Sequence, residues 1–228
     1  MIDFHSHVLP GIDDGSDSVA TSLAMLAEMK AQGIEAVFAT PHFYANRNNP
    51  ARFLAKRDAA YESLCADGSL PLPVTLGAEV HFFTGIGKSE DVESLCLSGT
   101  KLLLLEMPFH EWTGRMLDEV EELIGRGILP VAAHLERYKG YVSKGMIAAF
   151  SDMDIYVQAN AEWFLDFWGK KKALAALRSG SVLFLGSDAH NMSSRAPNLG
   201  PALAYIEKSL GSGFVESLSA RQKSVIYG

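Results

Sequence analysis

The chain has 228 residues, of which 48% are hydrophobic, and a formal net charge of -7 at pH 7. This length suits one domain, residues 1–228, with a sizeable core, and the acidic balance disfavours a nucleic-acid backbone as the main ligand. No apolar run approaches the roughly 18 residues of a membrane-spanning helix. The acidic start leads directly into a strand-like run, which predicts that no signal peptide is present. Cys65 and Cys96 form no CxxC pair, so we expect a cytoplasmic protein without a disulfide framework.

Short apolar runs alternate with longer amphipathic segments along the chain. The expected strands are Ile2–His5, Ala36–Ala39, Val74–Ala78, Leu102–Glu106, Leu129–Ala133, Ile155–Ala159 and Val182–Leu185. The expected helices are Ser18–Gln32, Pro50–Ala66, Glu111–Arg126, Lys144–Phe150, Lys170–Ser179 and Pro197–Leu210, followed by a helix and short tail over Phe214–Gly228.

Repeated strand–helix units predict parallel strands covered by helices. About seven units can be counted, which predicts an α/β fold with a distorted TIM-like barrel. An open doubly wound sheet is the competing architecture. Ligand-type residues follow most of the expected strands, and only closure of a barrel brings all strand ends around one centre. This distribution favours the barrel.

The first expected strand runs into His5 and His7. On a strand, residues i and i+2 point to the same side, so both imidazoles would face one spot. Histidine is the commonest transition-metal ligand near neutral pH, yet such pairs also occur on ordinary surfaces. The later strand ends therefore decide what this pair means.

Residues that suit metal binding follow the later strands as well. They are Asp13, Asp14, His42, Glu79, His81, Glu106, His134, Glu136, Asp188 and His190. Each alone fits an ordinary polar loop position, but loops at the opposite end of the strands carry no histidine, so the set indicates a metal site. Mixed imidazole and carboxylate ligands without thiolates suit Mn, Fe or Zn. The set is too large for one ion, which predicts two or three divalent ions bridged by Glu79 or Glu106.

Clustered divalent ions favour hydrolysis of a phosphoester or an amide. Arg137 and Arg195 follow the fifth and seventh strands, and arginine binds phosphate through paired hydrogen bonds, so phosphate hydrolysis is favoured. The alternative for each is a surface salt bridge, for Arg137 with Glu136. A cysteine phosphatase is disfavoured, because no arginine stands six residues after either cysteine.

Six blocks of the chain resemble the PHP (polymerase and histidinol phosphatase) family, and within it the bacterial metal-dependent protein-tyrosine phosphatases of capsular and exopolysaccharide operons, the CpsB type. The blocks are Met1–His7, Asp13–Gly15, Thr40–His42, Gly77–Glu79, Ala133–Tyr138 and Ser187–Asn191. The resemblance spans nearly the whole chain but not the loops Phe43–Asn49 and Phe109–Gly114, which include His110 and Trp112.

The resemblance implies a distorted barrel with three metal ions, often manganese. The ligands that it implies are His5, His7, Asp14, His42, Glu79, Glu106, His134, Asp188 and His190. It also implies that Arg137 and Arg195 bind phosphate, and that the substrate is phosphotyrosine on the tail of a bacterial tyrosine autokinase controlling polysaccharide export.

From this resemblance we predict that a metal-bound hydroxide attacks phosphorus in line, without a covalent phosphoenzyme, and that His42 or Asp188 shares in proton transfer. Two alternatives stay open. One is another PHP phosphoesterase, acting on a small phosphate ester such as histidinol phosphate or on a nucleic-acid end. The other is a non-catalytic, metal-dependent regulatory protein. A homo-oligomer and the roles of His81 and His110 also stay open. The aromatic residues Tyr44, Phe109, Trp112, Trp163 and Trp168 suit a phosphotyrosine groove, a subunit contact or ordinary packing.

Overall fold

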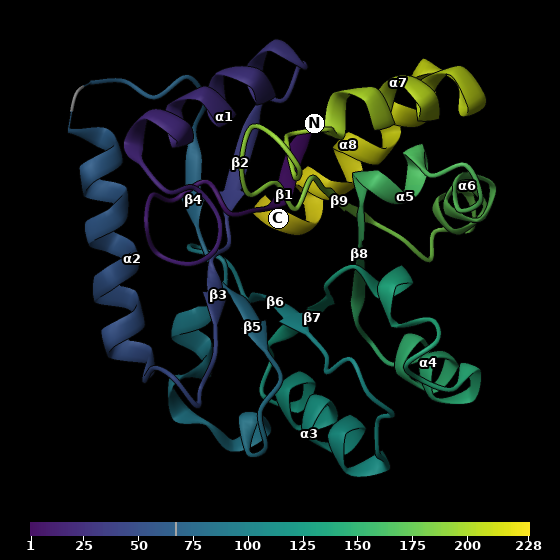
Figure 1. Ribbon diagram of the computed structural model, residues 1–228. Helices are drawn as coiled ribbons and strands as arrows, with labels where there is room; N and C mark the ends of the chain where they lie inside the picture. Colours follow the sequence, from purple (N-terminus) through teal and green to yellow (C-terminus); the bar gives the residue numbers. More distant parts are fainter. Residues whose placement is uncertain (67) are drawn as a thin grey trace.

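The computed structural model describes residues 1–66 and 68–228. Its strands are β1 (Ile2–Ser6), β2 (Ala36–Ala39), β3 (His42–Phe43), β4 (Val74–Leu76), β5 (Glu79–His81), β6 (Leu102–Glu106), β7 (Leu129–Ala132), β8 (Tyr156–Asn160) and β9 (Phe184–Gly186). Its α-helices are α1 (Val19–Ala31), α2 (Pro50–Cys65), α3 (Gly114–Gly125), α4 (Lys144–Ser151), α5 (Ala161–Leu165), α6 (Lys170–Ser179), α7 (Leu199–Leu210) and α8 (Ser212–Tyr227). Figure 1 shows the strands gathered in the middle with helices around them.

All paired strands run parallel, in two sheets with the orders β1-β2-β4 and β3-β5-β6-β7-β8-β9. The two sheets also meet at β1 and β9. The Asp188 N–H donates to the His5 carbonyl (2.8 Å), and the Ser187 N–H donates to Asp3 Oδ1 (2.9 Å). The expected α/β class with a curled parallel sheet is therefore confirmed, while the count of seven βα units is not.

The expected strand Val74–Ala78 is in fact interrupted, and its second part belongs to the other sheet. β4 ends at Leu76 and β5 begins at Glu79, so Glu79 and His81 lie on a strand and not after one. Gly77 marks the break, where a Cβ atom would lie 2.2 Å from Leu97 Cδ2. The short strand β3 was also not expected, and it follows Pro41, which lacks the N–H needed to continue a ladder.

Four of the eight α-helices in residues 1–66 and 68–228 begin where a side chain caps them. Ser18, Asn49, Thr113 and Ser143 each accept a hydrogen bond from a backbone N–H of the first turn. The expected helix from Glu111 therefore begins three residues later, after the Thr113 cap. The short helix α5 was not expected from the sequence.

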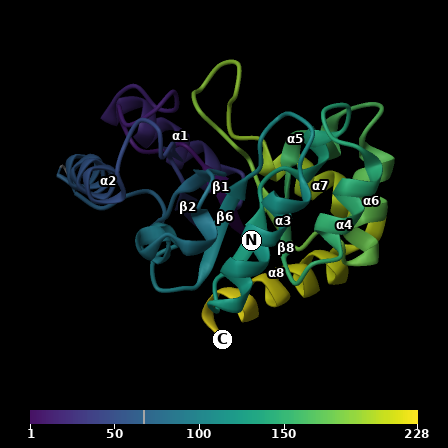
Figure 2. The ribbon, with the colours of Figure 1, turned by 90° about the horizontal axis from the view of Figure 1, so that it is seen from below.

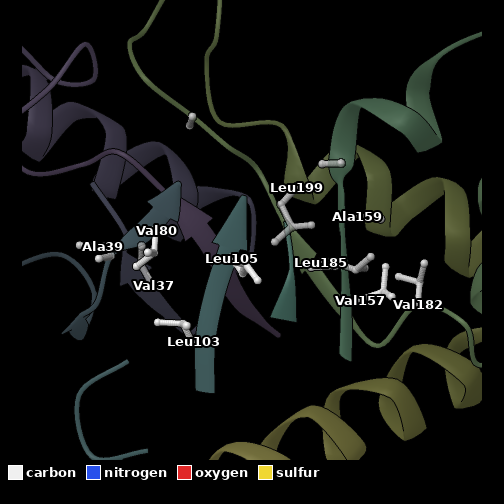
Figure 3. Packing of buried hydrophobic residues seen from close by; sticks show 14 of the residues in the cluster. Val37, Ala39, Val80, Leu103, Leu105, Val157, Ala159, Val182, Leu185 and Leu199 are labelled. Carbon is white, nitrogen blue, oxygen red and sulfur yellow. The ribbon is translucent and has the colours of Figure 1, made fainter. Parts of the chain in front are cut away.

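The core has two parts, because alternate strand residues point to opposite sides. Leu103 and Leu105 of β6 belong to a large cluster under the helices, which Figure 3 shows together with Val37, Val80 and Val157. A smaller inner cluster lies between the strands. Its members are Ile2, Phe4, Phe38, Leu97, Leu102, Leu104, Val131, Ala133, Phe184 and Ile226.

Helix α8 covers the end at which the strands begin, and it contributes Ile226 to the inner cluster. Gln222 Nε2 donates to the Leu183 carbonyl (2.9 Å), just before β9. Glu35, just before β2, pairs with Lys223 Nζ (2.6 Å) and with the Met1 amino group (2.8 Å). Figure 2 shows α8 along one edge of the molecule. In the described part of the chain, every helix is too short or too polar to cross a membrane.

Candidate metal centre and phosphate pocket

The structure brings all nine expected metal ligands together at the ends of the strands. They fall into four overlapping groups, and in each group the possible ligand atoms lie within 4.8 Å of one another. The groups are His7, Asp14, His42 and His190; His5, Glu79 and His134; His5, His7 and Asp188; and His42, Glu79 and Glu106. Asp14 is the exception in burial, since 66% of its side chain is exposed.

Donor atoms crowd around the first histidine. His5 Nε2 lies 3.2 Å from His7 Nε2, 3.3 Å from Glu79 Oε2 and 3.5 Å from Asp188 Oδ1. Imidazole nitrogens and carboxylate oxygens gathered at such distances form the donor set that a divalent cation coordinates.

Four buried atoms of the candidate ligands, namely His42 Nδ1, Glu79 Oε2, His134 Nδ1 and His190 Nε2, have no hydrogen-bond partner. His42 Nδ1 and Glu79 Oε2 are only 2.7 Å apart, yet neither has a hydrogen-bond partner. A buried polar atom without a partner costs about 1–3 kcal/mol. Coordination of cations would satisfy such atoms, so the residues fit a metal centre.

Hydrogen bonds to the opposite ring nitrogen orient three of the histidines. Nδ1 of His5 lies 3.2 Å from Gln158 Oε1, Nδ1 of His7 lies 2.8 Å from Asp13 Oδ2, and Nδ1 of His190 lies 2.9 Å from the Asp188 carbonyl. When Nδ1 donates in each pair, Nε2 keeps its lone pair for a metal ion.

The sequence grouped Asp13 with the residues that suit metal binding and gave no role to Gln158. Asp13 also accepts from the His42 N–H (2.9 Å), and Gln158 Oε1 also accepts from the His134 N–H (2.9 Å). Each therefore holds two candidate ligands at once. Their proximity in sequence to Asp14 and to the end of β8 was the available signal.

The electrostatics of the centre keep Glu79 and Asp188 ionised. Burial raises the pKa of both Glu79 and Asp188, but the nearby imidazoles, above all His5, outweigh it and hold both pKa values well below the ordinary range. Burial and the neighbouring His7 lower the pKa of His190 to about 4, which leaves its imidazole neutral at pH 7. Ionised carboxylates and a neutral imidazole are the forms that bind metal.

Two candidate ligands have a strained backbone. His134 (φ 33°) and Asp188 (φ 52°) are, within residues 1–66 and 68–228, the non-glycine residues with positive φ. This left-handed conformation costs of order 1–3 kcal/mol for such residues and is concentrated at functional sites. Both residues stand where the chain leaves a strand, and the turn directs the His134 and Asp188 side chains into the centre.

Both expected phosphate-binding arginines lie beside the same carboxylate. Arg137 Nη1 is 3.4 Å from Asp188 Oδ2, and Arg195 Nη2 is 2.8 Å from Asp188 Oδ1. Their side chains are 46% and 39% exposed, and both line a cavity of about 350 Å³ together with Asn160. We call this cavity the phosphate pocket. The ion pair that Arg137 forms is with Asp188, and not with Glu136 as the alternative supposed.

The remaining histidines differ in their relation to the centre. His81 Nδ1 lies 2.9 Å from Glu106 Oε2, and its ring is 5.4 Å from that of Tyr44, so both form part of the rim. His110 is exposed and belongs to none of the four groups. Trp112 is buried against Tyr138 and Phe150, which supports ordinary packing for this residue.

Comparison with known proteins places the chain among bacterial phosphatases of capsule synthesis. The CpsB/CapC family model, described as capsular polysaccharide synthesis, matches residues 1–226. Tyrosine-protein phosphatase CpsB of Streptococcus pneumoniae is 29% identical over 222 residues, which cover 92% of this chain and 91% of that protein. Tyrosine-protein phosphatase YwqE of Bacillus subtilis is 29% identical over 221 residues, with coverages of 93% and 86%.

Solved structures agree with this relationship. A crystal structure from work on YwqE of Bacillus subtilis and CpsB of Streptococcus pneumoniae, described as metal-dependent tyrosine phosphatases, matches with a TM-score of 0.82 and 27% identity. The match covers 99% of this chain and 94% of that one. A phosphotriesterase homology protein of Escherichia coli (TM-score 0.53, 15% identity, 94% of each chain) shares the fold alone. The chain thus belongs to the CpsB/CapC family.

Proposed function

We propose that the protein is a metal-dependent phosphatase that hydrolyses phosphotyrosine on a protein. One observation carries this proposal. Nine metal-type ligands lie together, and two half-exposed arginines contact one of them, Asp188, beside a cavity. The relatives of similar length, which are named tyrosine-protein phosphatases, support the substrate class.

The proposed ligands are His5, His7, Asp14, His42, Glu79, Glu106, His134, Asp188 and His190. We propose two or three divalent ions, with manganese first and iron or zinc as alternatives, because the donors are nitrogen and oxygen without sulfur. Glu79 belongs to two of the four groups, so it is the better candidate than Glu106 for a bridging carboxylate. Bound ions supply Lewis acidity there, which lowers the pKa of water and offsets charge on phosphoryl oxygens.

The residues of the chain have separable roles in this proposal. Arg137 and Arg195 bind the phosphoryl oxygens and stabilise the charge that they gain during transfer. Phe109 lies under Arg137, with the guanidinium carbon 5.2 Å from the ring centroid, and helps to hold it. His42 and Asp188 are the candidates for accepting or returning a proton. A tyrosine leaving group has a pKa of about 10, so it needs little help from an acid.

A comparison of substrates tests this function. The purified protein would be stripped with a chelator, reloaded with Mn²⁺, and assayed side by side on a phosphotyrosine peptide, histidinol phosphate and a single-stranded oligonucleotide. We expect metal-dependent release of phosphate, fastest from the peptide. A preference for histidinol phosphate or the oligonucleotide would instead support another phosphoesterase, and absence of turnover with bound metal would support a regulatory protein.

The partner and the setting are parts of the same proposal. The substrate is the tail of a bacterial tyrosine autokinase that controls capsular or exopolysaccharide synthesis, acted on in the cytoplasm. The family description, capsular polysaccharide synthesis, supports this setting. Pull-down of the kinase with a protein that retains substrate but turns it over slowly would test the partner.

We also propose that β2–β3 and β4–β5 each form one kinked unit, which gives seven βα units in a distorted TIM-like barrel. Two hydrogen bonds across the breaks support this count. The Gly77 N–H donates to the Ala39 carbonyl (2.8 Å), and the Glu79 N–H donates to the Pro41 carbonyl (3.0 Å). The two kinked segments therefore stay side by side, and residues 1–228 form one domain in this view.

A further inference from the structure

A second cavity, larger than the phosphate pocket, opens beside it. Its volume is about 690 Å³, and α4, α5 and α6 contribute to its wall, on the right of Figure 1. Apolar side chains form much of this wall, among them Ile147 of α4, Trp163 of α5 and Ala176 of α6. We call this cavity the side groove. Its size and apolar lining suit one large or two medium side chains of a ligand.

The side groove is continuous with the phosphate pocket. A depression of about 230 Å³ lies between them. It shares Arg137, Asn160 and Glu162 with the phosphate pocket, and Glu136, Trp163 and Asp166 with the side groove. A ligand whose phosphate reaches Arg137 thus has a path along the surface into the apolar cavity.

Two exposed lysines, Lys139 and Lys172, line the side groove. The ammonium group of Lys172 lies close enough to Lys139 to lower the pKa of Lys139. Among the described residues, no ion pair joins either lysine to a carboxylate within 4.0 Å. Three carboxylates, Glu136, Asp152 and Asp166, also line the groove, but Glu136 and Asp166 accept hydrogen bonds from backbone N–H groups. The two exposed ammonium groups can therefore attract an anionic group of a ligand.

The mouth of the side groove carries the most exposed aromatic side chains of the described residues. Phe167 is 71% exposed and Trp168 is 83% exposed, and their ring centroids are 5.0 Å apart. Trp168 also lines the groove. A tryptophan left in water next to an apolar cavity is typical of a recognition surface, because its indole buries a large area on binding.

We propose that the side groove binds the stretch of substrate polypeptide next to the phosphotyrosine, with an apolar side chain in the cavity and an acidic side chain at Lys139 and Lys172. The continuity with the arginines and the unpaired lysines select this occupant. The inference rests on the proposed function, and it explains how the protein distinguishes a phosphorylated chain from a small phosphate ester, which ends inside the phosphate pocket.

The test compares rates on matched substrates in the Mn²⁺-loaded protein. The substrates are free phosphotyrosine and three phosphotyrosine peptides: one with a leucine and a glutamate beside the phosphotyrosine, one with serine for the leucine, and one with glutamine for the glutamate. The variants are Trp168→Ala and Lys172→Gln. The controls are Tyr227→Ala, which is 67% exposed on α8, and Lys171→Gln, an exposed neighbour that does not line the groove.

We expect Trp168→Ala to lower kcat/KM for the leucine peptide about tenfold relative to free phosphotyrosine, as loss of an aromatic anchor does. Lys172→Gln should remove the preference for glutamate over glutamine, and the two controls should leave both ratios unchanged. Melting temperatures equal to that of the unaltered protein would exclude misfolding, which the exposure of Trp168 already makes a small concern.

Unchanged ratios in both variants would overturn the inference. A second outcome would also overturn the inference. If Trp168→Ala changes the molar mass measured by sedimentation but leaves the ratios unchanged, the groove binds a second copy of the chain. In either case metal-dependent hydrolysis of free phosphotyrosine would leave the proposed function standing. Failure to hydrolyse any phosphotyrosine substrate would remove the proposed function, and the inference with it.

Discussion

The strands enclose a space with two ends, and the same strands form both. The two ends differ in chemistry. At the end covered by α8, ten buried apolar residues form the inner cluster. At the other end, buried histidines and carboxylates converge. β1 contains the contrast in two consecutive residues, since Phe4 belongs to the cluster and His5 to the centre.

The difference shows that one end stabilises the fold while the other is built at a cost. A fully buried Phe or Leu side chain contributes about 1.5–3 kcal/mol by removal from water. Buried charges cost free energy unless they are paired or coordinated. At the centre, the unpaired donor atoms and the positive φ of His134 and Asp188 add to that cost. The five changes below separate the two ends, from the largest expected effect to the smallest.

His134→Ala should abolish phosphatase activity and lower the amount of bound metal, because it removes an imidazole 2.9 Å from Glu79 Oε1. The backbone strain at position 134 remains, because alanine also disfavours a positive φ, while a buried ring nitrogen without a hydrogen-bond partner is removed. We therefore expect little change in the stability of the metal-free protein. Metal analysis, turnover and urea unfolding in chelator would be measured together. Activity that persists after the metal is lost would contradict the proposed chemistry.

Arg195→Ala should lower kcat/KM about 10²–10³-fold, the usual effect of losing one group that stabilises transition-state charge. Metal content should stay at the level of the unaltered protein, because Arg195 contacts Asp188 without being a candidate ligand. Arg195→Lys is the matched control and should recover part of the rate. A loss of metal in Arg195→Ala would make the arginine structural.

Phe4→Ala should lower the free energy of unfolding by about 3–5 kcal/mol, as large-to-small changes in a core do. Phe4 is 1% exposed and its ring centroid lies 3.9 Å from that of Phe184. Urea unfolding in chelator measures the change without a contribution from metal, and Phe4→Leu should cost less. A small loss in Phe4→Ala would mean that the inner cluster does not carry the stability assigned to it.

Asp13→Asn should weaken metal affinity about 10–100-fold, which is typical for loss of a group that orients a ligand. Asp13 accepts from His7 Nδ1 at 2.8 Å, and the neutral amide leaves the ring orientation less well fixed. The metal concentration giving half-maximal activity is the measurement. Asp17→Asn, outside the four groups, is the control. An unchanged midpoint would show that Asp13 does not position His7.

Glu35→Gln should have the smallest effect, below about 1 kcal/mol, because 54% of the Glu35 side chain is exposed and solvent screens its ion pairs. Lys223 and the amino terminus lower the pKa of Glu35 to about 2. Its contribution is therefore present above pH 4.5, the ordinary value, and is lost as the pH falls through 2.

The matching measurement is the urea midpoint at pH 7 and at pH 3 for Glu35→Gln and for Glu216→Gln on the exposed side of α8. The difference between the urea midpoints at pH 7 and at pH 3 should become smaller in Glu35→Gln and stay unchanged in Glu216→Gln. Equal pH dependence in both variants would show that the ion pairs of Glu35 do not contribute to stability.

The sequence was sufficient to predict the α/β class and the end of the strands where candidate ligands meet, and the family resemblance selected the nine residues that the structure gathers. This worked because parallel strands end at one edge, so a ligand after each strand is also a ligand near the others. Their role as metal ligands stays a prediction. The interruption of β4–β5 at Gly77 was not predicted, because glycine occurs both in strands and at breaks.

The orienting roles of Asp13 and Gln158 could not be predicted from spacing. Adjacent carboxylates such as Asp13 and Asp14 are equivalent in a sequence, and only the path of the loop decides that one accepts from His7 and the other joins His190. The side groove depends on how α4, α5 and α6 lie beside one another, which is set by tertiary packing and leaves no local pattern.

The meeting of β1 with β9 has a consequence for how the protein is made. Ser187 donates to Asp3 across 184 positions of the chain. A ribosome adds about 5–20 residues per second, so β1 emerges many seconds before the strand beside which it must lie. Closure of so long a loop is entropically costly and slow. During synthesis His5 and His7 are therefore exposed before Asp188 has been made, and the centre that they share can assemble only after β9 has left the ribosome.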